Sequence, residues 1–150
     1  MIIVGSTLDK VYPGFGKRQF DRILTALAQT KSGTTWEIGN LGGYLSLFFS
    51  TMVQIILVSP LIDDKSFDCV ADITRRGYEV LVISPSPIEI EKRKLPVDSQ
   101  YLFAERLMKV KRRNRVNLLR RSVAVVDWNI NIPLSVALQE ATYAWNRRRK

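Results

Sequence analysis

The feature that most constrains the fold is a set of three short apolar runs, rich in β-branched residues and with little polar alternation. They are VQIILV at 53–58, YEVLVI at 78–83 and VAVV at 123–126. Continuous runs of this kind are typical of strands buried on both faces, as in a parallel sheet. Segments with helical spacing separate the runs, at 66–76 and 99–121. The sequence therefore predicts an α/β fold, with a mostly parallel sheet and helices on both faces.

The rest of the chain adds further elements to this alternation. We expect a single domain over residues 1–150, because no linker is long enough to divide the chain. The other predicted elements are a strand at 2–4, a very short strand at 11–12, helices at 17–30 and 36–49, and a last helix that starts near Pro133.

Two of the helices carry signals for their ends or faces. In the helix at 66–76, Ser66 is the predicted N-cap residue and Gly77 the C-terminal stop. In the helix at 99–121, the sequence predicts that one apolar stripe faces the core and that the basic residues face water. The residues of this stripe are Phe103, Leu107, Val110 and Leu118. The charged segment between Pro87 and residue 98 is predicted to be a loop.

An uncharged stretch from Ile38 to Ile62 raises the question of a membrane span, since Tyr44 to Ile62 is long enough for one. The residue types change midway, however. Residues 41–49 favour a helix, whereas 53–58 are β-branched and favour a strand. We therefore expect a helix followed by a buried strand, and no membrane span.

The composition excludes several classes of site. The chain has no histidine and one cysteine, Cys69. The commonest general acid–base side chain, His-dependent zinc sites and intrachain disulfides are therefore absent. Ser59 ends a buried strand, but no G-x-S-x-G motif surrounds it. We expect a non-enzymatic, cytoplasmic protein in which Cys69 is a buried, inert thiol.

All of the net charge of +9 comes from the second half of the chain. Residues 1–75 hold seven basic and seven acidic residues, whereas residues 76–150 hold sixteen and seven. The excess lies in the segment 104–121 and in the tail 147–150. This surface is either a solvated helix face or a contact for an acidic partner such as nucleic acid. A nucleic-acid interface would use Lys109, Lys111, Arg112, Arg113, Arg115, Arg120 and Arg121.

Three short motifs have both a chemical and a structural interpretation. Gly14-x-Gly16 precedes a helix, as phosphate loops do, but the rest of a phosphate-loop motif is missing, so a turn is favoured. Asp63 and Asp64 follow a buried strand, where carboxylates can hold Mg²⁺. A turn and helix start is the interpretation that we favour for both. Asp127 also follows a strand, and we favour a turn or capping role for it.

Five segments resemble a known family. They are VYPGFGKRQFDRILTALAQ (11–29), VQIILVSPLIDD (53–64), RRGYEVLVISPSP (75–87), AERLMKVKRRNRVNLLRRS (104–122) and VAVVDWNINIPLSVAL (123–138). Together they are similar to the C-terminal part of the von Willebrand factor A-like domain of prokaryotic domain-of-unknown-function family 58. The resemblance implies a von Willebrand A-like, Rossmann-like fold. It also implies an association with MoxR-type AAA+ ATPases in the assembly of protein complexes.

The resemblance bears on metal binding. Many von Willebrand A domains bind Mg²⁺ through a D-x-S-x-S loop, a threonine and an aspartate. Thr34 and Thr35 match the threonine element, but the D-x-S-x-S loop is absent and Pro60 stands where the aspartate is expected. Asp63 and Asp64 could replace that aspartate only from a different position. We therefore predict no cofactor and no tight Mg²⁺ site.

The resemblance also implies that this chain lacks the first, central strand of that fold. This strand would lie between the strands at 2–4 and 53–58. Its absence would leave backbone donors and acceptors open to strand addition. We expect either that the remaining strands pair with each other, or that a second chain fills the place, as another copy or as a strand donor.

The leading expectation is a protein-interaction module that acts as a partner of an AAA+ ATPase, as the resemblance implies. Its contact surface would include the carboxyl ends of the strands. The residues expected there are Ser59, Asp63, Asp64, Ser84 and Asp127. The alternative is a nucleic-acid-binding protein that uses the basic helix at 104–121 and the basic C-terminal tail.

Overall fold

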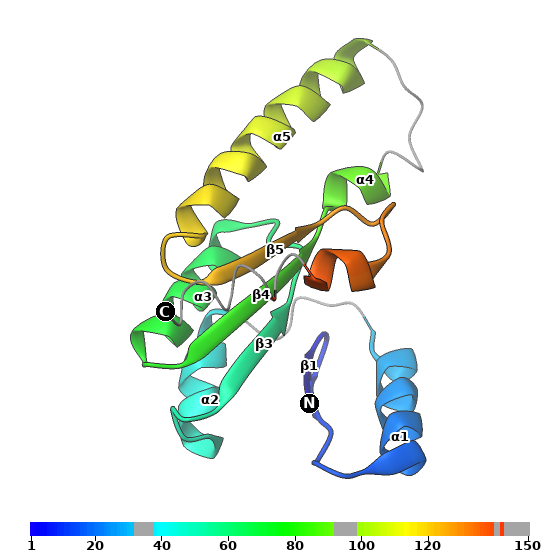
Figure 1. Ribbon diagram of the computed structural model, residues 1–150, viewed down its shortest axis with the longest axis vertical. Helices are drawn as coiled ribbons and strands as arrows, with labels where there is room; N and C mark the ends of the chain where they lie inside the picture. Colours follow the sequence, from blue (N-terminus) through cyan, green and yellow to red (C-terminus); the bar gives the residue numbers. More distant parts are fainter. Residues whose placement is uncertain (32–37, 92–98, 140–141, 143–150) are drawn as a thin grey trace. The chain divides into compact units, whose positions relative to one another are not determined.

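Three parallel strands form the main sheet of the computed structural model, which describes residues 1–31, 38–91, 99–139 and 142 (Figure 1). The strands are β3 (Gln54–Val58), β4 (Glu79–Pro85) and β5 (Ala124–Trp128), in the order β3-β4-β5. Val58 pairs with Ile83, and Ile83 pairs with Val126. The predicted α/β class and the parallel pairing of the three β-branched runs are confirmed.

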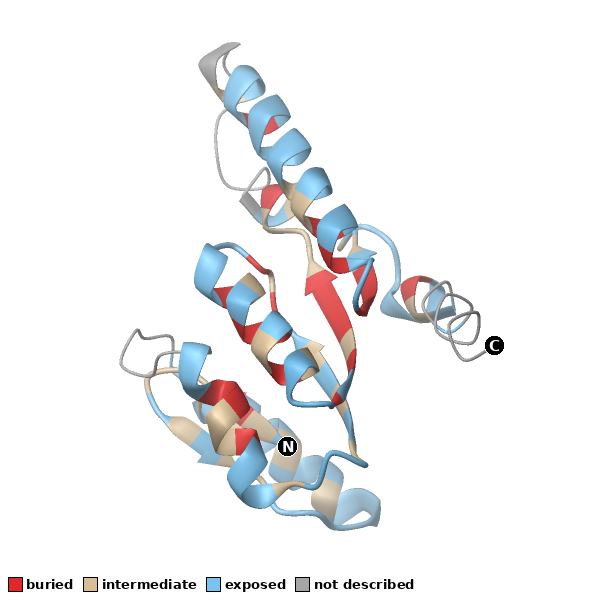
Figure 2. Ribbon diagram, turned by 90° about the vertical axis from the view of Figure 1, so that its left-hand side faces the viewer, coloured by how far each residue is buried: buried red, intermediate tan, exposed pale blue. Residues whose placement is uncertain are grey.

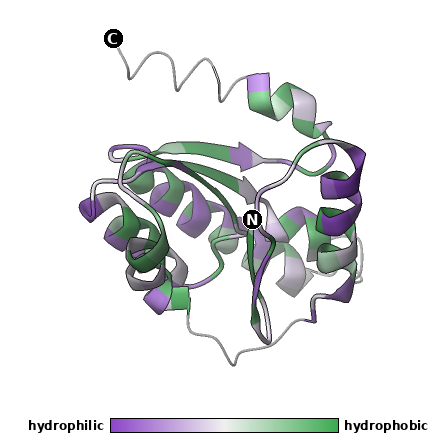
Figure 3. Ribbon diagram, turned by 90° about the horizontal axis from the view of Figure 1, so that it is seen from below, coloured by the Kyte–Doolittle hydropathy of each residue, from purple (hydrophilic) through white to green (hydrophobic). Residues whose placement is uncertain are grey.

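Helices cover both faces of this sheet, as predicted. Two helices, α3 (Asp64–Arg75) and α5 (Ser99–Leu119), connect the strands and pack on β4 and β5. Their residues Ile73 and Val116 are buried. In Figure 2 both helices are largely exposed and carry only short buried segments. The other face carries Ile83 and Val126, which pack against Ala137 in the helix at 134–139. In Figure 3 this last helix lies on the opposite side of the largely hydrophobic strands from α3.

The start of α3 differs from the expectation. Asp63 is the N-cap residue, and its Oδ1 accepts hydrogen bonds from the Ser66 backbone N at 2.9 Å and from the Ser66 Oγ at 2.5 Å. The prediction of Ser66 as the N-cap is wrong because the carboxylate three residues earlier satisfies the free N–H first. The helix-start interpretation of Asp63 and Asp64 is confirmed. Gly77 follows the helix with a φ of +88°, as expected for a C-terminal stop.

The uncharged stretch forms a helix and a strand, as expected, but the prediction that this strand is buried is wrong, because the residues of β3 alternate between exposed and half-buried. A short 3₁₀ helix, η1 (Ile38–Asn40), leads into α2 (Leu41–Phe48), and β3 follows. A Cβ at Gly42 would lie 2.1 Å from an Asp72 carboxylate oxygen, so α2 approaches α3 closely at this glycine. Among the residues that the structure describes, no helix is long and apolar enough to cross a membrane.

The segment after β4 contains a helix where we expected only a loop. The strand continues to Pro85, and α4 (Pro87–Glu91) begins at the next proline. Proline suits the first position of a helix because the N–H that it lacks has no partner there. Residues 92–98 of the expected loop lie outside the described part of the chain.

The chain forms two compact units, residues 1–41 and 42–150, and the first contains a sheet of its own. In this unit β1 (Ile2–Val4) pairs antiparallel with β2 (Leu8–Lys10). The second strand therefore lies at 8–10 rather than at 11–12. The expectation that β1 belongs to the parallel sheet is wrong. The connection between the two strands is short and is closed by a hydrogen bond from Gly5 N to Thr7 O. Pairing these strands therefore costs little loop-closure entropy.

The first unit also contains α1 (Gly16–Gln29), close to the predicted helix at 17–30. Gly16 begins this helix with a φ of +69°, which favours glycine and supports the turn interpretation of Gly14-x-Gly16. The apolar residues Phe20, Ile23, Leu24 and Leu27 of α1 recur at the spacing of one helix face, yet none of them is buried. The spacing of the apolar residues thus predicts the helix, but it does not predict that its apolar face stays exposed.

Candidate functional site

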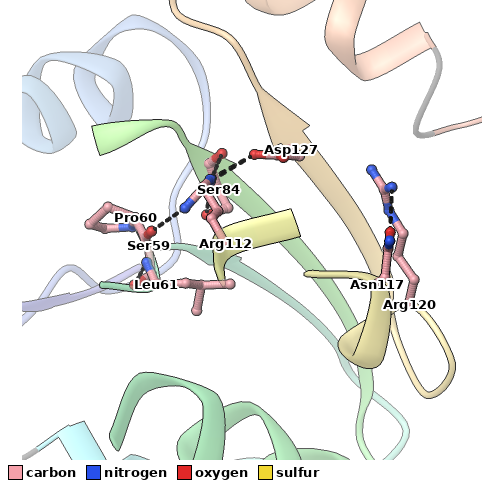
Figure 4. Close-up of polar contacts among 8 residues, drawn as sticks. All are labelled: Ser59, Pro60, Leu61, Ser84, Arg112, Asn117, Arg120 and Asp127. Atoms are coloured by element: carbon pink, nitrogen blue, oxygen red, sulfur yellow. Dashed lines mark hydrogen bonds and ion pairs between the residues drawn. The ribbon is translucent and has the colours of Figure 1, made fainter. Parts of the chain in front are cut away.

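The carboxyl ends of the three parallel strands meet at one arginine. Arg112 on α5 has a side chain that is only 10% exposed. It donates from Nη1 to Pro60 O at 2.8 Å, and from Nη2 to Ser84 O at 3.1 Å and Ser84 Oγ at 2.9 Å. Its Nε and Nη2 both donate to Asp127 Oδ1, at 3.1 and 2.7 Å (Figure 4). One guanidinium therefore ties together the chain after β3, the end of β4 and the end of β5.

Arg112 occupies part of the surface that we expected to contact a partner protein. Ser59, Ser84 and Asp127 do lie at the same edge of the sheet, as parallel strands require. Ser84 is fully buried and its hydroxyl accepts a hydrogen bond from Arg112. Ser59 is also buried, and its hydroxyl accepts one from Leu61 N at 3.3 Å. Of these three residues, Asp127 remains partly accessible, so the edge is filled from within rather than open.

Backbone geometry next to this cluster keeps one acceptor in place. Leu61 is buried and has a φ of +50°, which is rare for a residue with a branched side chain. The turn that it forms follows Pro60, whose carbonyl oxygen accepts from Arg112. A strained residue of this kind costs on the order of 1–3 kcal/mol. The burial of Leu61 and the charged hydrogen bond to Pro60 offset that cost.

The two remaining residues of the expected surface are used at the start of α3. Asp63 caps the helix, and the hydroxyl and backbone N–H of Ser66 lower the pKa of its carboxyl group. Asp64 forms an ion pair with Arg115. Both were weak candidates for Mg²⁺ binding, together with Thr34 and Thr35, which lie outside the described residues. The described part of the chain contains no group of three acidic, cysteine or histidine side chains that could hold a metal ion.

The basic face of α5 is smaller than the sequence suggests. The prediction that Arg112 faces water is wrong, because its hydrogen bonds hold it against the sheet. Lys109 forms an ion pair with Glu105 at 2.6 Å and lies 3.8 Å from Glu89. Arg115 pairs with Asp64 and lies over the Phe67 ring, 5.4 Å from its centre. Four members of the predicted set have an exposed side chain and no acidic partner in the described structure. They are Lys111, Arg113, Arg120 and Arg121.

The buried face of α5 is also not the predicted one. Phe103, Leu107 and Val110 are exposed, and so is Leu118. The inward positions are Glu105, Arg112, Val116 and Leu119. Leu107 and Val116 are nine residues apart, which places them about 180° apart on a helix. The helix has an apolar stripe on each side, and polar partners at the strand ends decide which side faces the sheet.

A cavity of about 370 Å³ lies beside the arginine cluster, between α4, α5 and the end of β5. Its floor includes Ile88 and Val116, both buried. This cavity was not predicted from the sequence. The only signal for it is the spacing of Arg113, Asn117 and Arg120, which places three polar side chains on one face of α5. The other residues around the cavity are Ser86, Glu89, Lys109, Arg112, Asp127 and Asn129.

The edge of β3 is a second candidate surface. In the sheet order β3-β4-β5, no described strand pairs with the outer side of β3. Its side chains alternate, and the outward Ile56 and Val58 are 59% and 65% exposed. We call these two side chains and the free edge of β3 the β3 surface. The β3 surface lies within the uncharged stretch from Ile38 to Ile62.

Cys69 fits the expected role of a structural thiol. It is buried in α3, and desolvation raises the pKa of its thiol to about 11. The reactive thiolate form is therefore rare near neutral pH. Cys69 belongs to the core and not to a site.

No protein-family model, curated protein or solved structure matches this chain. The resemblance to the von Willebrand A-like domain thus stays a prediction. What the chain does has to be argued from the arginine cluster, the cavity and the β3 surface themselves.

Proposed function

We propose that the chain is a non-enzymatic protein-interaction module that binds an extended segment of a partner protein along the β3 surface. The observation that carries this proposal is the unprotected edge of β3 in the described structure. The strand reads QIILV and contains no charged residue, proline or bulge. Natural edge strands are commonly protected by such features, because a bare edge pairs readily with another chain.

The chemistry of the β3 surface determines which kind of partner segment can bind to it. Strand addition satisfies the free backbone N–H and C=O groups, and the side chains decide specificity. Ile56 and Val58 offer two apolar side chains, each worth about 1.5–3 kcal/mol when fully buried. No charged residue occurs between Ile38 and Ile62, so a charged segment would find no counter-charge there. The expected occupant is an uncharged, β-branched segment in an extended conformation.

The arginine cluster supports binding rather than catalysis. The hydroxyl of Ser84 and the carboxylate of Asp127 are both engaged by Arg112. Ser59 is buried and hydrogen-bonded to the backbone of Leu61. These polar groups serve to join the strand ends, which keeps the sheet rigid behind the β3 surface.

The resemblance supports a particular partner for this module, a MoxR-type AAA+ ATPase encoded in the same genome. The test is titration of that purified ATPase with the wild-type chain and with Ile56→Lys, by calorimetry. Leu107→Lys is the matched control, since Leu107 is 62% exposed on the outer side of α5. We expect Ile56→Lys to weaken binding at least about tenfold, since a lysine cannot be buried cheaply beside the new strand. Equal losses for the two variants would rule out the β3 surface as the contact.

Hydrogen exchange tests the mode of binding independently of affinity. Amides of β3 that face the open edge are expected to exchange fast in the free chain and slowly in the complex. Slow exchange of all β3 amides in the free chain would mean that something already pairs with this edge. Strand addition by a partner would then be excluded.

Nucleic-acid binding has less support. Of the seven basic residues proposed for it, Lys109, Arg112 and Arg115 are engaged within the chain. The smaller remaining set would still bind phosphates in a salt-dependent way. A gel shift with DNA and RNA at two salt concentrations separates the two functions, since the protein-interaction module predicts no salt-sensitive shift.

A further inference from the structure

We propose that the cavity between α4 and α5 binds the diphosphate group of a small phosphorylated ligand, held by Arg113 and Arg120. This inference is independent of the β3 surface and goes beyond the proposed protein-interaction function. The cavity of about 370 Å³ has the size of known small-molecule sites, roughly 300–1,000 Å³. It lies beside the carboxyl end of β5, the side of a parallel sheet where ligands of α/β proteins bind.

The charges around the cavity are not balanced within the protein. The carboxylate of Glu89 lies 3.8 Å from Lys109, and that of Asp127 is held by Arg112 at 2.7 Å. Lys109 also pairs with Glu105 at 2.6 Å, so three carboxylates face the two engaged cations Lys109 and Arg112. Arg113 and Arg120 bring the cations around the cavity to four, one more than these carboxylates. Arg113 has no acidic partner among the described residues. The positive charge of the cavity is therefore available to an anion.

Arg120 is held loosely, which leaves it able to bind. Its Nη1 donates a long hydrogen bond of 3.4 Å to the uncharged Oδ1 of Asn117. Figure 4 shows this pair apart from the Arg112 cluster. A phosphate offers the planar guanidinium a shorter, charged and bidentate interaction. The amide of Asn129 lines the same cavity and supplies a further donor.

The spacing of the two arginines favours two phosphate groups over one. Arg113 and Arg120 are seven residues apart on α5, which places their Cα atoms about 10.5 Å apart along the helix axis. Side chains of this length can bracket a diphosphate from its two ends. The buried Ile88 and Val116 form an apolar floor that suits the non-phosphate part of the ligand. A nucleoside diphosphate combines both properties.

Calorimetry with ADP, with inorganic pyrophosphate and with a short single-stranded oligonucleotide tests this inference. We expect ADP to bind the wild-type chain, and Arg113→Gln and Arg120→Gln each to weaken that binding at least about tenfold. Lys111→Gln is the matched control, because Lys111 is an exposed cation of α5 that does not line the cavity. Pyrophosphate is expected to compete with ADP and to lose affinity in the same two variants.

Three results would overturn the inference. These are no binding of ADP or pyrophosphate, an equal loss in Lys111→Gln, and oligonucleotide binding that is tighter than ADP binding and equally sensitive to all three substitutions. The last result would assign α5 to a diffuse nucleic-acid contact. Circular dichroism confirms that each variant is folded, which is expected because the three side chains are exposed. None of these results affects the proposal for the β3 surface.

Discussion

The guanidinium of Arg112 donates two hydrogen bonds to one oxygen of Asp127, the Oδ1, from Nε at 3.1 Å and from Nη2 at 2.7 Å. Because Nη2 also donates to Ser84, the end of β4 and the end of β5 are joined through one side chain. The carboxyl edge of a parallel sheet is where catalytic and metal sites of such folds usually lie. Here a charged residue of the chain itself occupies the middle of this edge, and the cavity between α4 and α5 opens beside it.

Arg112→Ala is expected to destabilise the chain by about 2–4 kcal/mol. The substitution leaves the buried Ser84 and the carboxylate of Asp127 without their donor, and such groups are costly when unpaired. The measurement is urea unfolding followed by circular dichroism. Arg113→Ala is the control, since Arg113 is exposed and should change stability by less than about 0.5 kcal/mol. A similar midpoint for both variants would contradict the structural role of Arg112.

A pair of valines tests which side of α5 faces the sheet. Val116 is 1% exposed, whereas Val110 is 58% exposed on the other side of the helix. Val116→Ala should cost about 1.5–2.5 kcal/mol, because two buried methyl groups are lost and a cavity remains. Val110→Ala should stay within about 0.5 kcal/mol of the wild type. Thermal unfolding would reveal the opposite order if the stripe predicted from sequence were the buried one.

The strands could be predicted because their signal is local and redundant. Each of the runs around Ile56, Val82 and Val125 is continuous and β-branched, and parallel pairing follows from the helices between them. The strand β2 was misplaced for the opposite reason. It is three residues long, and Leu8–Lys10 contains two charged residues, so no apolar pattern marks it.

The site could be predicted only in part. The topology of a parallel sheet brings Ser59, Ser84 and Asp127 to one edge, and this much followed from the order of elements. An arginine in a basic helix, however, normally faces water, and nothing local distinguishes Arg112 from Arg113. The choice is made by tertiary structure. Unpaired acceptors at the strand ends, including Asp127 and Pro60, stabilise a guanidinium there, and α5 is oriented accordingly.

The two adjacent glycines of α2 are expected to respond differently to alanine. A Cβ at Gly43 meets nothing within 4 Å, so Gly43→Ala should stabilise the chain by about 0.5–1 kcal/mol through higher helix propensity. At Gly42 the Cβ would lie 2.1 Å from an Asp72 oxygen, which is also paired with Arg76 at 2.8 Å. Gly42→Ala must displace that carboxylate and should gain less or lose stability. Differential scanning calorimetry of both variants checks this order. A higher melting temperature for Gly42→Ala than for Gly43→Ala would refute the close approach of α2 to α3.

The N-cap of α3 should make part of the stability depend on pH. Hydrogen bonds from the hydroxyl and backbone N–H of Ser66 lower the pKa of Asp63 below its ordinary value. A lowered folded-state pKa adds stability above the unfolded pKa, about 3.9 for aspartate, and that contribution is lost as the pH falls through the folded value. Asp63→Ala is therefore expected to cost about 1 kcal/mol at neutral pH.

The check is urea unfolding of the wild type and Asp63→Ala at about pH 6 and about pH 3. The difference between the two should shrink at the lower pH, since Asp63 then takes up a proton more readily in the unfolded chain than in the folded one. Asp63→Asn is the matched control, because asparagine is an equally good N-cap residue without a titrating group. The difference between this variant and Asp63→Ala should not depend on Asp63 protonation. A wild-type advantage over Asp63→Ala that stays constant across this range would show that the carboxylate charge does not stabilise α3.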